Sequence, residues 1–140
     1  ACKKEATQIN DIFGDMEKSV RIMESYVLDM VEGNADIENR DVQNEIIEHS
    51  EDMFMDVAKH TNGAVAYYLR FNPEISDDKT GFFYSKPEGS GEYIRLEATD
   101  LALYEKDDRE HVGWFWEPYE AGEPVWMKPY HNRNNGTYLK

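Results

Sequence analysis

A long amphipathic stripe near the N-terminus is the feature that most restricts how this chain folds. Between residues 7 and 32, apolar side chains recur at steps of three and four, which places them on one side of an α-helix: Ile9, Ile12, Met16, Val20, Met23, Val27 and Met30. Phe13, Tyr26 and Val31 widen this stripe. We therefore expect it to be buried, at least partly, against a second helix or a second copy of the chain.

A second helix is predicted to begin between Asp36 and Asp41 and to end near His60, with Gly33-Asn34 before it and Asn62-Gly63 after it. Its apolar residues fall on one face and its margin: Val42, Ile46, Ile47, Met53, Phe54, Val57 and Ala58. Acidic residues surround His49 on the polar side, but no second histidine follows at the spacing of a metal site. We interpret this side as a solvated surface and expect no metal ion.

The pattern changes to short β-rich runs after Gly63. Residues 64–71 are aromatic and are stopped by Asn72-Pro73, and residues 81–86 end at the turn-rich segment 87–91. These two runs predict a pair of neighbouring antiparallel strands, and residues 92–98 predict a third extended piece.

Residues 110–121 predict a short helix that stops at Gly122, followed by an extended segment at 124–127 and a polar tail. The predicted fold class is therefore α+β, with long N-terminal helices packed on an antiparallel sheet that contains an inserted short helix. With 140 residues, the chain fits one domain, divided into a helical part over 1–62 and a sheet-containing part over 63–140.

Charge and cysteine content narrow the classes of partner. The 29 acidic residues outnumber the 15 basic ones, giving a net charge of −14. Because binding to phosphate backbones requires clustered basic residues, nucleic acids and anionic membranes are poor partners. Cys2 is the only cysteine, so no disulfide forms within the chain. No apolar run reaches the length of a transmembrane helix, so any membrane contact is expected through segments absent from this chain.

An aromatic stretch between His111 and His131 is the candidate binding region. It holds every tryptophan of the chain, broken by prolines and glycines that favour turns. Indole and phenol rings combine an apolar face with a polar group, which suits the wall of a ligand pocket, although a packed core is the alternative. We expect four pocket walls, Trp114, Trp116, Trp126 and Tyr130, and four polar contributors, Tyr67, Arg70, Asp100 and Tyr104. Arg70 could instead pair with a carboxylate on the sheet, and Asp100 could cap a turn.

Several segments together resemble a Cache domain, the PAS-like extracytoplasmic sensor family of bacterial histidine kinases, diguanylate cyclases and chemoreceptors. The resemblance covers roughly residues 5–138 and rests on a long N-terminal helix, YYLRFNPE, GFFYSK, TDLALYEKDD and, most specifically, VGWFWEPYEAGEPVWMKPY. It implies a PAS-like sheet that is incomplete here. It also implies an extracytoplasmic domain of a transmembrane receptor that binds a small molecule, pairs as a homodimer through its N-terminal helices, and carries neither catalytic residues nor a cofactor.

One departure from the family concerns the ligand. Amino-acid-binding Cache domains have an arginine two residues before the tryptophan, where this chain has Val112 before Gly113 and Trp114. We therefore expect little preference for the carboxylate of a free amino acid. Aromatic walls and an acidic surface favour a flat, partly apolar ligand or a cation.

Two other classes of function stay open. A secreted carbohydrate-binding or glycoside-cleaving domain would use Asp107 and Asp108, or the pair Glu110 and His111, as acid and base. A helix-mediated interaction module would instead bind a partner helix and no small ligand.

Overall fold

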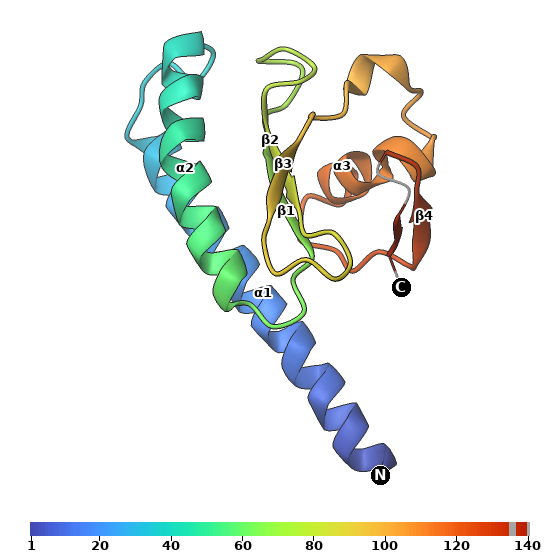
Figure 1. The fold of residues 1–140 in the computed structure, drawn as a ribbon. Coiled ribbons are helices and arrows are strands. Elements are labelled where there is room, and N and C mark those ends of the chain that lie inside the picture. The colour runs from blue at the N-terminus through green and yellow to red at the C-terminus, as the bar shows by residue number, and fades with distance from the viewer. Residues whose placement is uncertain (135–136, 140) are drawn as a thin grey trace. The chain divides into compact units, whose positions relative to one another are not determined.

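The computed structural model describes residues 1–134 and the backbone of residues 137–139. The chain forms two compact units, residues 1–98 and residues 99–140, which we describe separately. Figure 1 shows the order of their helices and strands. No helix among the described residues is both long and apolar enough to cross a membrane.

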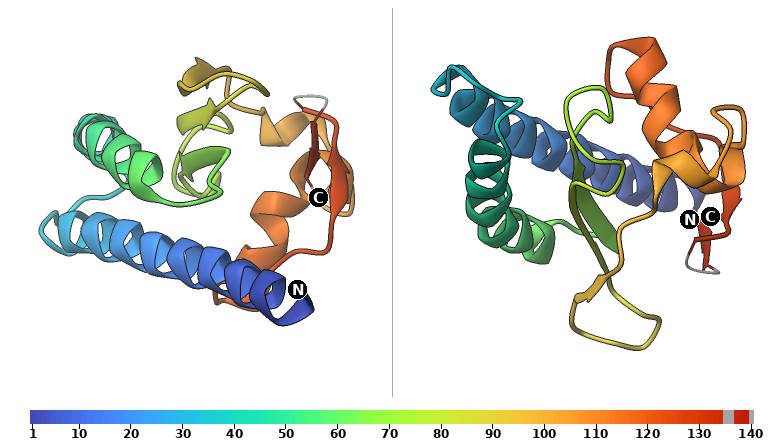
Figure 2. Two further views of the ribbon diagram at one scale, coloured as in Figure 1. Left: turned by 60° about the horizontal axis from the view of Figure 1, so that its bottom comes forward. Right: turned by 90° about the horizontal axis from the view of Figure 1, so that it is seen from above.

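Two helices begin the first unit, α1 (Cys2–Glu32) and α2 (Arg40–His60), and they lie side by side in both views of Figure 2. Asn39 starts α2, because its side chain accepts a hydrogen bond of 2.8 Å from the backbone N–H of Asp41. At the other end of α2, the hydroxyls of Thr61 and Ser19 lie 2.5 Å apart and join the two helices.

The apolar stripe of α1 is only partly covered within its own unit. Met23 and Val27 pack against the core, as expected for the stripe. However, no residue of α1 is fully buried, and Ile9 and Val20 remain 52% and 44% exposed. Burial by a second copy, the other part of the expectation, stays a prediction.

A three-stranded antiparallel sheet follows, in the order β1 (Ala66–Arg70), β2 (Gly81–Ser85) and β3 (Ile94–Leu96). Tyr68 pairs with Phe83, so the two aromatic runs are neighbouring antiparallel strands, as predicted. The α+β class is confirmed. Gly81 permits the close pairing at the start of β2, because its φ is +138° and an added Cβ would lie 2.0 Å from the Leu69 carbonyl oxygen.

The first core lies between α2 and one face of this sheet. Its buried members are Phe54, Ala58, Tyr67 and Phe82, with the rings of Phe54 and Phe82 packed edge to face. Because α2 contacts both β1 and β2, the helices and the sheet belong to one compact unit. The boundary between the two compact units falls after Ala98.

The second unit contains η1 (Leu101–Leu103), α3 (Arg109–Ala121), β4 (Tyr130–Asn132) and β5 (Thr137–Leu139). Its core consists of Leu101, Val112 and Trp116. Gly122 ends α3 with a φ of +67°, as predicted. Residues 124–127 form no regular strand, and the polar tail that we predicted lies within the antiparallel β4–β5 hairpin.

Candidate functional site

The start of α3 is the best-defined polar site of the second unit. Asp108 is the N-cap residue, and its Oδ1 accepts a hydrogen bond of 3.2 Å from the backbone N–H of His111. Its other carboxylate oxygen, Oδ2, lies 2.8 Å from Nδ1 of the His111 ring. One aspartate thus satisfies a free N–H of the helix and orients an imidazole at the same time.

The environment of this pair sets its charge and geometry. The hydrogen bond from His111 is the main cause that lowers the pKa of Asp108 below its ordinary value. The Tyr104 ring stacks on the imidazole, with centroids 4.2 Å apart and planes inclined by 12°. The His111 side chain is only 20% exposed. Asp108 and Tyr104 therefore hold the ring in one orientation.

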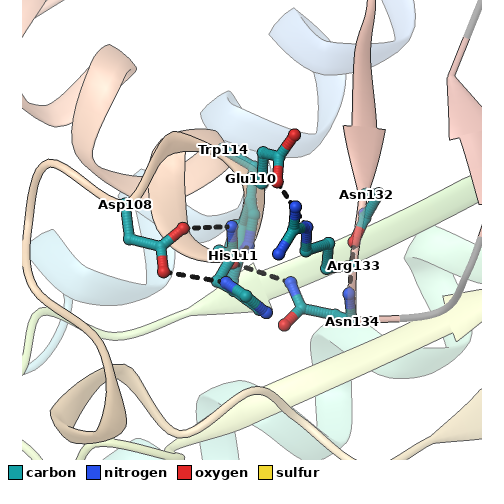
Figure 3. A network of polar contacts seen from close by, with 7 residues as sticks. All are labelled: Asp108, Glu110, His111, Trp114, Asn132, Arg133 and Asn134. Carbon is teal, nitrogen blue, oxygen red and sulfur yellow. Dashed lines mark hydrogen bonds and ion pairs between the residues drawn. The ribbon is translucent and has the colours of Figure 1, made fainter.

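The backbone carbonyl of His111 is a second junction, shown in Figure 3. It accepts hydrogen bonds from the indole N–H of Trp114, at 2.8 Å, and from the side-chain amide of Asn134, at 2.7 Å. Arg133 forms an ion pair with Glu110, and its backbone N–H donates to the Glu110 carbonyl oxygen. These contacts join the first turn of α3 to the chain that follows β4.

The Asp108–His111 pair resembles part of a catalytic arrangement without completing one. When Nδ1 donates to Asp108, Nε2 of a neutral imidazole is a proton acceptor. However, residues 99–140 contain neither serine nor cysteine that would serve as an activated nucleophile in the same unit. In the glycoside-cleaving alternative, the acid and base would be Asp107 with Asp108, or Glu110 with His111. However, Asp108 caps α3 and contacts the His111 ring, and Glu110 pairs with Arg133. The contacts of Asp108 and Tyr104 hold the His111 ring in one orientation.

The structure gives the predicted pocket walls different environments. Trp116 is 8% exposed and belongs to the core, and the ammonium group of Lys106 lies 4.2 Å from the centroid of its ring. Trp114 packs against the same core. Trp126 is 55% exposed. Tyr130 is half-buried, and burial is the main cause that raises its pKa.

The four predicted polar contributors also lie in different environments. Tyr104 packs against the second core together with Trp114 and Trp116, so the structure brings three of the predicted residues together. Asp100 caps η1, which was its alternative role. Tyr67 and Arg70 belong to the first unit: Tyr67 is 5% exposed within the core, and the Arg70 guanidinium donates to the Asp78 carbonyl oxygen.

Sequence reasoning did not identify three contributors to the polar site, Asn132, Arg133 and Asn134, because they lie in a tail without periodicity. A usable signal exists for Asp108, since an aspartate directly before the first helical residue is a typical N-cap. The first unit holds a further polar cluster, in which Glu51 accepts a hydrogen bond of 2.8 Å from Tyr84 and forms an ion pair with Arg95.

Two shallow cavities lie in the first unit. One, of about 270 Å³, is lined by residues that precede and begin α2 and by the β1–β2 loop, among them Arg40, Gln43 and Asp77. The other, of about 410 Å³, is a groove lined by α1 residues and Met53 of α2. Within the described part of the chain, no group of acidic, histidine or cysteine side chains is arranged to hold a metal ion.

Searches among known protein families, curated proteins and solved structures found no match to this chain. The likeness to Cache domains therefore rests on the sequence motifs alone, and function has to be argued from geometry.

Proposed function

We propose that this chain is the extracytoplasmic small-molecule-sensing domain of a bacterial transmembrane receptor, of the sensor histidine kinase or diguanylate cyclase type. The observation that carries the proposal is the junction at His111, where an aromatic cluster and a polar network meet between α3 and the end of β4. Such a junction offers a ligand apolar surface and oriented polar groups without the components of a reaction centre.

The ligand site is proposed around Trp126 and Tyr130. Both lie in the segment that leads from the end of α3 into β4, and Trp126 is the most exposed of the predicted pocket walls. Because it is 55% exposed, Trp126 is the indole proposed to receive a flat, partly apolar ligand or a cation.

The signalling mechanism is a shift between two arrangements of the second unit. A ligand bound to the segment between α3 and β4 acts on the same connection that Asn134 and Arg133 make to the first turn of α3. It changes the populations of the two arrangements only by its difference in affinity for them. The 31 residues of α1, about 46 Å of helix, are the element proposed to carry the change toward the rest of a receptor.

A thermal-shift screen of amines, aromatic metabolites, amino acids and carboxylates tests this function, because a ligand that binds only the folded state raises the melting temperature. We expect stabilisation by members of the first two groups and loss of most of that shift in Trp126→Ala. If no compound stabilises the protein, the sensor proposal is wrong. If anionic amino acids stabilise it most and Trp126→Ala leaves the shift intact, the site and the ligand class are both wrong.

A further inference from the structure

The turn that joins α2 to β1 contains an exposed Asn62-Gly63 step. The backbone N–H of Ala64 donates to the Thr61 carbonyl oxygen at 3.3 Å, so Asn62 and Gly63 are the two central residues of a β-turn. Gly63 has a φ of +80°, a value that glycine adopts without the strain of a side chain. The step is therefore fixed as a turn at the surface of the first unit.

The groups of this step that can react with each other are not engaged elsewhere. Within the described part of the chain, the Asn62 side-chain amide forms no hydrogen bond and the Gly63 N–H donates to no acceptor. The nitrogen of the following residue is the nucleophile nearest to the side-chain carbonyl carbon of an asparagine. Glycine carries no side chain that would hinder its approach. An electrophile and a nucleophile are thus adjacent in an accessible turn.

The other described asparagines each lack a feature that such a reaction needs. Asn72 precedes Pro73, which has no N–H. The remaining ones have side chains held in hydrogen bonds, or lie inside a helix, where the next N–H is bonded within the helix: Asn34, Asn39, Asn132 and Asn134 in the first group, Asn10 and Asn44 in the second. A second Asn-Gly step, at 135–136, lies outside the described residues.

We propose that Asn62 is a site of spontaneous covalent modification, at which the side chain deamidates through a succinimide. The Gly63 nitrogen attacks Cγ of Asn62 and forms a new C–N bond, and the side-chain nitrogen takes up the proton of the attacking N–H and leaves as ammonia. Water then opens the ring at either carbonyl carbon. One opening gives aspartate in a normal main chain, and the other gives isoaspartate, in which the main chain runs through Cβ and Cγ.

This modification reaches α1. A Cβ added at Gly63 would lie 3.0 Å from Cγ2 of Ile12 and 3.1 Å from Cε of Met16, so the turn packs closely against α1. On the other side of residue 62, the Thr61 hydroxyl lies 2.5 Å from that of Ser19. Isoaspartate adds a methylene group to the main chain between these two contacts. Because close-packed contacts tolerate little change in volume or spacing, isoaspartate should weaken the attachment of α1 to this turn.

Peptide mapping of the full folded chain, after incubation at mildly alkaline pH, tests the site. Trypsin cleavage after Lys59 and Arg70 releases residues 60–70, in which Asn62 is the only asparagine. We expect this peptide to gain the mass of an amide-to-acid conversion and to contain both aspartate and isoaspartate. Because the exposed turn reacts without local unfolding, its rate should lie within about tenfold of the rate in the urea-unfolded chain. The peptide of residues 134–140 reports the second Asn-Gly step separately.

Two variants serve as controls. Asn62→Gln should leave residues 60–70 unchanged, because its side chain is longer by a methylene group and closes the ring poorly. Asn62→Asp carries the charge of the product in a normal main chain, so it separates the effect of charge from that of the lengthened main chain. The aged native chain, enriched in isoaspartate, should melt a few degrees below Asn62→Asp.

The proposal is overturned if residues 60–70 keep their mass in the folded chain, or if they convert more than about tenfold more slowly than in urea. Conversion of Asn62→Gln at the native rate would also overturn it. An aged chain that melts together with Asn62→Asp would contradict the effect on α1. None of these results depends on ligand binding, so the sensor function is tested separately.

Discussion

Both carboxylate oxygens of Asp108 bind His111, one through the backbone N–H and one through the ring Nδ1. The same histidine accepts hydrogen bonds at its carbonyl from Trp114 and Asn134. The helix cap, the orientation of the imidazole and the connection to β4 therefore all involve His111. Because Asp108 holds His111 at two points, disturbing Asp108 should affect all three.

Asp108→Ala should lower the melting temperature by a few degrees, because α3 loses its N-cap and the imidazole loses its acceptor. Asp107→Ala is the matched control, since Asp107 is exposed and does not cap the helix. Circular dichroism during thermal unfolding measures both. Equal melting temperatures for the two variants would contradict the role assigned to Asp108.

The contribution of Asp108 to stability should depend on pH. Its folded pKa lies below the ordinary value of 3.8, mainly because of the hydrogen bond from His111, so the folded state favours the charged form. This contribution is present above the unfolded pKa and is lost as the pH falls through the lower folded pKa. Urea unfolding from pH 6 down to about pH 2 should show native protein and Asp108→Asn converging at the acid end. A stability difference that stays constant over this range would be evidence against the shift.

Removing the hydroxyl of Tyr67 and removing that of Tyr84 should change the free energy of unfolding in opposite directions. The Tyr67 hydroxyl is buried without a hydrogen-bond partner in the described residues, and burial is the main cause that raises its pKa. Removing an unsatisfied buried group is neutral or stabilising, so Tyr67→Phe should gain up to about 1 kcal/mol in free energy of unfolding. Tyr84→Phe should lose about 1 kcal/mol, because it gives up the hydrogen bond to Glu51.

This pair of variants also examines the role first expected for Tyr67. A polar ligand contact would make Tyr67→Phe weaken ligand binding, whereas a core residue leaves binding unchanged. Urea unfolding measures the stability of Tyr67→Phe, and the thermal shift with a bound compound measures whether its ligand binding is weakened. Destabilisation by Tyr67→Phe would show that its hydroxyl has a partner after all.

Gly81→Ala should destabilise the sheet by about 2 kcal/mol or more, because the added Cβ meets the Leu69 carbonyl oxygen in a backbone conformation that side chains rarely adopt. Gly91→Ala is the control, since no atom lies within 4 Å of its Cβ position. Urea unfolding compares the two. If Gly81→Ala is as stable as Gly91→Ala, the registered pairing of β1 with β2 is wrong.

Periodicity in the sequence predicts most of the regular structure. The stripe from Ile9 to Met30 predicts α1, the aromatic runs predict β1 and β2, and Gly122 predicts the end of α3. These elements were predictable because local backbone preferences and burial act in the same direction. The β4–β5 hairpin was not, because its residues are mostly polar and do not alternate.

The candidate site was harder to predict than the fold, since the same side chains suit a core and a pocket. Trp116 and Tyr67 have the ring chemistry of a binding site, but packing places both in cores. Asp100 caps η1, a role that depends on local geometry and gives no periodic signal. Asn134 contributes through a hydrogen bond to a residue far away in the sequence, which no local pattern reveals.

Intrinsic fluorescence gives the most direct test of the proposed sensor, because every tryptophan of the chain lies between residues 114 and 126, in the second unit. A compound that raises the melting temperature is titrated into the native chain and into Trp126→Ala. We predict saturable fluorescence change in the native chain and at least about tenfold weaker binding in Trp126→Ala, a loss of about 1.4 kcal/mol. Equal affinity in both proteins, or no saturable change with any stabilising compound, would contradict the claim that this aromatic segment is the ligand site.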